Sequence, residues 1–232
     1  MYSHGIATLM LAEVYGMCNK KLQREVRFAL ERGIRLILAA QQVNKPASHG
    51  GGWRYNITSS DSDLSVTGWQ LLALRAAKNV GCDVPAESIE RAIGYVKKCA
   101  VRNNDGFGYQ AGHNATPTRT GTGILALEVC GEHRCVEVMG GANYLLRKPL
   151  REHDAFFSYG AYYCTVGLFK VGGEYWDRSS LHIYEMLLRL QNFDGSWPLG
   201  RSGEMSAGRY YSTSMAVLAL AVEYRYLPIY QR

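Results

Sequence analysis

Helical segments of two kinds alternate along this sequence. One kind is amphipathic, as in residues 20–41, where Leu22, Val26, Leu30, Ile34 and Ile37 share one stripe opposite Lys, Arg and Glu. The other kind carries no charge over ten residues or so, as in 64–74, 158–169 and 210–222. A charged face must touch water, whereas a helix without charge on any side must be enclosed. The alternation therefore predicts two layers of helices, the uncharged ones inside.

Signals for β-strands are nearly absent, so we expect an all-α fold built from helical hairpins. The predicted inner helices cover residues 4–16, 63–79, 118–130, 157–171 and 209–222. If successive hairpins rotate about an axis, the inner layer surrounds a central hollow. An open solenoid would leave one inner face wet, which suits uncharged helices less well.

A recurring turn separates the hairpins. Its copies are Gly51-Gly52-Trp53, Gly106-Phe107 and Gly195-Ser196-Trp197, each with an aromatic residue one or two places after a glycine. Glycine adopts turn conformations that other residues avoid, and the aromatic ring can cover apolar surface at the end of a helix. The recurrence indicates a repeat protein.

Composition narrows the choice of partners. The net charge is +6 over 232 residues, but the basic residues are scattered, so we expect no nucleic-acid binding. No apolar run approaches the ~20 residues of a membrane span, and we expect no integral membrane segment. We expect no signal peptide, and the six cysteines lack disulfide-framework spacing. We therefore expect a cytoplasmic protein with buried, structural thiols.

The stretch Gln191 to Trp197 matches the pattern Gln-x-x-Asp-Gly-x-Trp, the QW motif of squalene and oxidosqualene cyclases. The whole chain resembles bacterial proteins with prenyltransferase and squalene oxidase repeats, which belong to the terpenoid cyclase-like superfamily. That resemblance implies an α/α toroid, two concentric layers of helical hairpins around an apolar cavity. It implies one domain over residues 1–232. The sequence departs from the family pattern in having fewer hairpins than a closed ring, so we expect it to be the C-terminal part of a longer toroid.

Asp61 and Asp63 are the candidate catalytic residues. Class II cyclases carry an Asp-x-Asp-Asp-Thr-Ala motif after a Gly-Gly-Trp, and Gly52-Trp53 likewise precedes Asp61-Ser62-Asp63 here. The resemblance implies that Asp63 is the proton donor, oriented by a hydrogen bond from Asp61, although Leu64 replaces the third aspartate. The alternative interpretation, which we favour, is that short carboxylates at a helix start cap free backbone N–H groups.

Aromatic residues gather at loop ends and near the starts of the inner helices. In a cyclase their rings would face the cavity and stabilise cations. Packing in the core is the alternative for each. The candidate substrate-binding residues are Tyr55, Trp69, Tyr109, Tyr162, Tyr163 and Tyr211.

Zinc-dependent prenyl transfer is not expected. Residues 159–168 resemble the helix that carries a zinc-binding histidine in prenyltransferase β subunits, but Gly160 occupies the ligand position. The segment Cys130 to Cys135, with His133, has metal-binding residue types but no fourth ligand nearby. We expect neither a metal nor a cofactor.

Two functional hypotheses follow. In the first, the hollow binds an isoprenoid-like or lipid-like apolar molecule and, if the chain is an enzyme, cyclises it as a squalene-type class II cyclase does. In the second, the chain is a non-catalytic repeat scaffold that binds a protein or a glycan on its rim or outer face.

Overall fold

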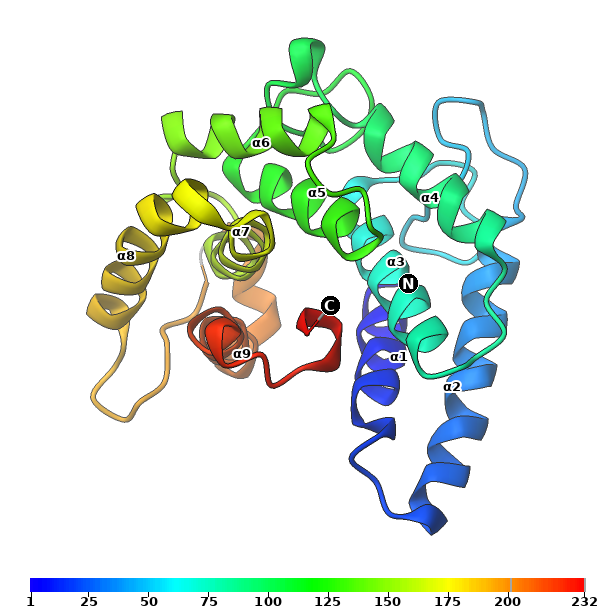
Figure 1. Ribbon diagram of the computed structural model, residues 1–232. Helices are drawn as coiled ribbons and strands as arrows, with labels where there is room; N and C mark the ends of the chain where they lie inside the picture. The colour runs from blue at the N-terminus through cyan, green and yellow to red at the C-terminus, as the bar shows by residue number, and fades with distance from the viewer. Residues whose placement is uncertain (201, 232) are drawn as a thin grey trace.

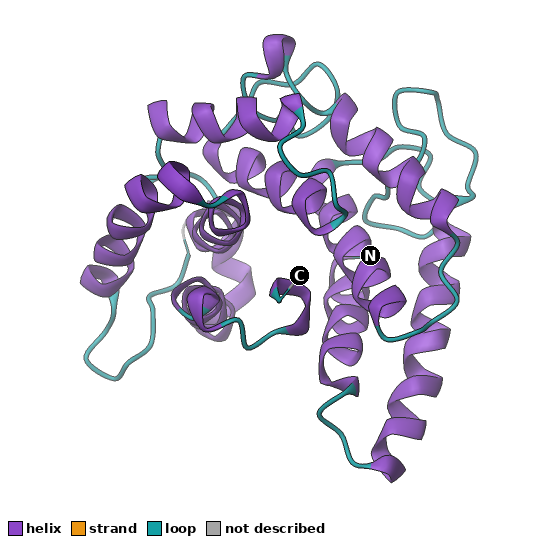
Figure 2. Ribbon diagram, in the orientation of Figure 1, coloured by secondary structure: helices purple, strands orange, loops and turns teal. Residues whose placement is uncertain are grey.

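The computed structural model describes residues 1–200 and 202–231, and these residues are all-α (Figure 2). Within them, β structure is limited to two isolated bridges, Trp53 with Asp63 and Ala100 with Phe107. The α-helices are α1 (Tyr2–Tyr15), α2 (Lys20–Gln41), α3 (Leu64–Asn79), α4 (Ala86–Lys98), α5 (Pro117–Val129), α6 (Val136–Arg147), α7 (Phe157–Val171), α8 (Gly173–Leu190) and α9 (Gly208–Leu220). Short 3₁₀ helices are η1 (Arg102–Asn104), η2 (Ser202–Ala207), η3 (Val222–Tyr224) and η4 (Pro228–Tyr230).

The odd-numbered helices form an inner layer and the even-numbered ones an outer layer. Helices α1, α3, α5, α7 and α9 pack against one another in succession along an arc, and α2, α4, α6 and α8 lie outside them (Figure 1). The inner helices begin and end within two residues of the predicted bounds. The all-α prediction is confirmed, and the alternation of charged and uncharged helices corresponds to the two layers.

Local sequence fixes where several helices begin and end. The side chain of Asn19 accepts a hydrogen bond from the Leu22 N–H at the start of α2, and Thr116 does the same for Arg119 at the start of α5. Pro117 follows Thr116 at a position where its missing N–H costs nothing. Gly172, with φ of +70°, ends α7.

The recurring turn joins three of the outer helices, α2, α4 and α8, to the inner helices that follow them; the connection from α6 to α7 has no copy of it. The backbone N–H groups of Trp53, Phe107 and Trp197 donate to the hydroxyls of Thr67, Thr120 and Thr213, at 3.0, 3.1 and 3.0 Å. The two indoles donate back to the outer helices, from Trp53 to the Ile37 carbonyl and from Trp197 to the Leu187 carbonyl, both at 2.8 Å. The same N–H to threonine hydrogen bond thus stabilises all three copies of the turn.

Side chains fill much of the centre of the arc. Trp69 of α3 stacks on Tyr162 of α7 with ring centroids 5.8 Å apart, and it meets Tyr163 edge-on at 5.4 Å. The C-terminal segment turns back into the space between α9 and α1 (Figure 1). There the Ile229 N–H donates to the Glu13 carboxylate at 3.0 Å, and the Tyr230 and Tyr162 hydroxyls are hydrogen-bonded.

Candidate functional site

A cavity of about 670 Å³ lies where the N-terminal ends of the five inner helices converge. Each inner helix contributes residues to it from its first two turns or from just before them, for example Ile6 of α1, Ser65 of α3 and Thr122 of α5. Six aromatic side chains form much of its wall: Tyr2, Tyr55, Tyr109, Phe156, Tyr159 and Tyr211.

Three of the predicted substrate-binding residues line this cavity and three do not. Tyr55, Tyr109 and Tyr211 are in its wall. Trp69, Tyr162 and Tyr163 are instead buried against one another in the core beneath it, and each is at most 3% exposed. For that second group, packing in the core is the observed arrangement.

Sequence reasoning missed several wall residues. Tyr159 lies one helical turn before Tyr162 and Tyr163 in the same uncharged run, and the sequence does not say which turn reaches the cavity. Tyr2 lies at the start of α1, far in sequence from the other aromatic wall residues. Its pKa is raised well above the ordinary tyrosine value, chiefly by burial, although Ser65 hydrogen-bonds it.

Glu204 is a buried carboxylate in the cavity wall that no sequence pattern identified. It belongs to η2, and its two oxygens accept hydrogen bonds from the Ser158 and Tyr159 N–H groups at the start of α7, at 3.1 and 2.8 Å. It therefore caps a helix from a distant segment and offsets the positive end of that helix dipole. Burial raises its pKa, and the two backbone hydrogen bonds oppose that rise.

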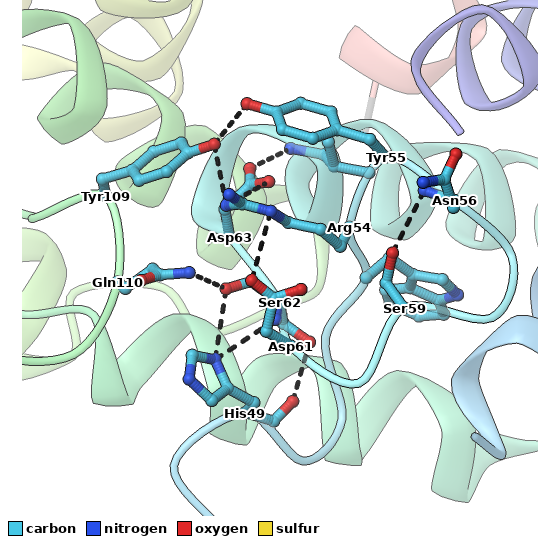
Figure 3. Close-up of polar contacts among 12 residues, drawn as sticks. His49, Arg54, Tyr55, Asn56, Ser59, Asp61, Ser62, Asp63, Tyr109 and Gln110 are labelled. Atoms are coloured by element: carbon cyan, nitrogen blue, oxygen red, sulfur yellow. Dashed lines mark hydrogen bonds and ion pairs between the residues drawn. The ribbon is translucent and has the colours of Figure 1, made fainter. Parts of the chain in front are cut away.

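Asp63 is fully buried and caps α3. One carboxylate oxygen accepts hydrogen bonds from the Val66 N–H and the Ser65 hydroxyl, both at 2.8 Å, and the other pairs with Arg54 at 3.3 Å (Figure 3). Burial raises the pKa of Asp63, whereas these hydrogen bonds and the Arg54 charge lower it; burial has the larger effect. Asp63 does not border the cavity, although its neighbours Leu64 and Ser65 do.

Arg54 lies between the two aspartates. Its Nε is 3.3 Å from Asp61 and its Nη1 3.3 Å from Asp63, so the guanidinium bridges the carboxylates where we expected a direct hydrogen bond between them (Figure 3). The same guanidinium lies over the Tyr55 ring at 4.6 Å and the Tyr109 ring at 5.2 Å. The two tyrosine hydroxyls are hydrogen-bonded to each other, and Arg54 donates to the Tyr109 hydroxyl at 2.9 Å. The cluster thus holds two aromatic walls of the cavity in place.

The positions considered for zinc have other roles in the fold. A Cβ atom on Gly160 would lie 2.8 Å from Leu150 Cδ1 and 2.8 Å from Thr118 Oγ1, so a larger residue there would require these side chains to shift. His133 Nδ1 pairs with the buried Glu128 carboxylate at 2.6 Å. Among the described residues, no three or more His, Cys, Asp or Glu side chains are arranged to hold a metal ion.

Comparison of the sequence with models of known protein families and with curated proteins gave no match. In the part of the chain that the structure describes, no helix is both long and apolar enough to cross a membrane. What the described residues show is a two-layer arrangement of helices, a glycine–aromatic turn with three copies, and a cavity at one end of the inner helices.

Proposed function

We propose that the chain is a repeat domain of the α/α-toroid class, similar to terpenoid cyclases, that binds an isoprenoid-like or lipid-like molecule in its cavity. The observation that carries this proposal is the cavity wall, in which five tyrosines and Phe156 surround about 670 Å³. This volume falls within the range of ~300–1,000 Å³ typical of small-molecule sites.

The chemistry of the wall supports a mostly apolar ligand with a small polar end. Several hydroxyls are already occupied, since Tyr55 bonds Tyr109 and Tyr159 bonds Thr122 at 3.1 Å. Ring faces and aliphatic groups such as Ile6 are left for the ligand. Polar groups also line the cavity, among them Arg119 and Glu204, and the Glu204 oxygens already accept hydrogen bonds from the start of α7. An alcohol or a similar headgroup fits that distribution better than a multiply charged one.

The test is to measure the binding of geraniol, farnesol and geranylgeraniol by calorimetry. Native mass spectrometry of the purified protein shows whether a lipid is already bound. Ala207→Trp places a ring into the cavity from an exposed position at the end of η2 and should abolish binding. Ser206→Trp adds the same ring at a neighbouring exposed position outside the wall and should leave binding intact. Equal binding by both variants would argue against this site.

Catalysis by Asp63 is the extension of this proposal, and we rank it behind binding. Its burial raises the pKa, as an acid requires, but its oxygens are held by Val66, Ser65 and Arg54, and it does not border the cavity. Incubation of the wild type and Asp63→Asn with squalene and oxidosqualene tests the assignment. Cyclic products that depend on Asp63 would establish a cyclase.

The ring-filled centre favours one alternative, a non-catalytic scaffold that binds a protein or glycan. Trp69, Tyr162 and Tyr163 occupy space that a ligand would need in a fully hollow toroid. Absence of co-purified lipid, together with failure of all three alcohols to bind, would favour this alternative.

A further inference from the structure

The C-terminal segment occupies the part of the central space that the cavity does not. Ile229 and Tyr230 of η4 are only 3% and 4% exposed, although they belong to one short turn outside any α-helix. Two polar contacts hold them, from the Ile229 N–H to Glu13 of α1 and between the Tyr230 and Tyr162 hydroxyls. The segment also packs against α3. It therefore connects the first inner helix to helices in the middle of the arc.

A continuous series of rings runs from the cavity to this segment. Tyr159 is in the cavity wall, and its ring centroid is 4.4 Å from that of Tyr163. Tyr163 is 4.8 Å from Tyr162, which is hydrogen-bonded to Tyr230. The space enclosed by the inner helices thus has an open end at the helix N-termini and a ring-filled remainder that ends at Tyr230.

Tyr230 supports the rings above it. The Tyr162 hydroxyl is buried and has the Tyr230 hydroxyl as its partner, so loss of Tyr230 removes both that hydrogen bond and the side chain packed beside it. A void left beside Tyr162 lets its ring move away from Trp69 and Tyr163, because a cavity of that size removes the packing that fixes the rotamer. The cavity then extends into the ring-filled part.

We propose that segment 227–230 is an internal plug that sets the depth of the cavity, with Tyr230 as the residue that limits the length of the bound molecule. The inference rests on the function proposed above. In the wild type the plug restricts the site to shorter isoprenoid-like or alkyl chains. A longer chain binds well only when the space held by Tyr162 and Tyr230 becomes available.

The test compares the affinities for geraniol and geranylgeraniol, which share a headgroup and differ in chain length. Tyr230→Ala should raise the affinity for geranylgeraniol relative to geraniol by about tenfold or more, since a few additional methylene groups become buried. Tyr230→Phe keeps the ring but loses the hydroxyl, and it should retain the wild-type ratio of the two affinities. This variant distinguishes the effect of side-chain volume from the effect of the hydrogen bond. Tyr226→Ala removes an exposed ring from the same part of the chain and should also change nothing.

Two further measurements distinguish failure of this inference from a folding defect in the variant and from failure of the proposed function. Tyr230→Leu retains an apolar side chain and should give an intermediate ratio if Tyr230→Ala does not fold. NMR of the ligand-free protein measures how fast the Trp69 indole N–H exchanges with solvent. This exchange should be faster in Tyr230→Ala than in the wild type. If the wild type binds neither alcohol, the proposed function fails, and the ligand-length assignment fails with it. If Tyr230→Ala has the same affinity ratio as the wild type, or the same exchange rate at Trp69, the proposal that segment 227–230 limits the depth of the cavity is wrong.

Discussion

Three buried carboxyl groups accept backbone hydrogen bonds, two of them from distant segments and one from the start of its own helix. Glu13 accepts from Ile229, Asp63 from Val66, and Glu204 from Ser158 and Tyr159. Burial raises the pKa of each. The folded protein therefore binds their protons more tightly than the unfolded chain does, and their combined effect on stability weakens as the pH rises through the raised pKa values.

Glu13→Gln isolates this effect at one residue. We expect the free energy of unfolding of the wild type, relative to the variant, to fall as the pH rises from the ordinary glutamate pKa of ~4.3 through the raised value. The amide oxygen of glutamine can still accept from Ile229, so the contact itself survives. Urea unfolding across mildly acidic pH measures the difference. A wild type that gains stability relative to the variant as the pH rises would contradict the assignment.

Asp63 and Asp61 form a matched pair two residues apart. Asp63→Ala removes the cap of α3 and leaves Arg54 without its buried partner, which should cost about 1–3 kcal/mol. Asp61→Ala removes a half-exposed carboxylate and should change the stability little. Denaturant unfolding of both variants measures the loss of stability that each substitution causes. Equal losses would show that the cap of α3 is not what Asp63 provides.

At the scale of elements, the sequence was sufficient to locate the layers. Charged and uncharged faces differ so strongly in their cost of burial that the alternation alone separates α2 from α3 and α8 from α9. The capping role favoured for Asp63 was predictable for a similar reason, because a short carboxylate before an apolar run is a local signal. The partnership between Glu204 and α7 was not predictable, because it joins segments that only the fold brings together.

The recurring turn depends on a threonine hydroxyl in the following inner helix. Thr67→Val keeps the shape of the side chain but leaves the buried Trp53 N–H without an acceptor, and it should cost about 1–3 kcal/mol. Thr58→Val, at an exposed loop position, is the control and should be nearly neutral. Urea unfolding of the two variants measures both costs. A neutral Thr67→Val would mean that the turn is held by its aromatic ring alone.

Substitutions at two glycines distinguish the cost of backbone strain from the cost of a steric clash. Gly51 and Gly81 both have positive φ, +96° and +77°. A Cβ on Gly81 meets nothing within 4 Å, so Gly81→Ala should cost only the ~1–2 kcal/mol of a left-handed conformation. A Cβ on Gly51 would lie 2.1 Å from the Arg91 carbonyl oxygen, so Gly51→Ala should cost clearly more. Thermal unfolding that ranks Gly81→Ala as the worse variant would contradict this geometry.

At the scale of the whole molecule, the sequence predicted an uncharged interior but not how that interior is divided. Tyr55 and Tyr162 look alike as aromatic residues near helix starts or loop ends, yet one lines the cavity and the other packs in the core. The difference depends on the depth of each side chain along its helix and on the C-terminal segment that returns to the centre. Neither is encoded in a local pattern.

The arc should be most stable in its middle. Helix α5 is packed between α3 and α7, whereas α1 has only α3 as an inner neighbour and α9 has only α7, apart from any minor contacts. Repeat arrays owe much of their stability to such neighbour interfaces, so amides of α5 should exchange with solvent more slowly than those of α1 and α9. Native-state hydrogen exchange followed by mass spectrometry measures this order. Slower exchange in α9 than in α5 would contradict it.

The hydrogen bond from Ile229 to Glu13 joins residues 216 positions apart in the sequence. Most of the other packing in the arc joins neighbouring helices, which can associate as soon as both have left the ribosome. Closure between α1 and the C-terminal segment must wait for the synthesis of nearly everything in between. Helix α1 therefore spends the whole of that time with its side chains for this contact, Glu13 among them, open to water and to chaperones. Helix α1 can pack against α2 and α3 early, so it is the contact between Glu13 and Ile229, and not the helix as a whole, that forms late.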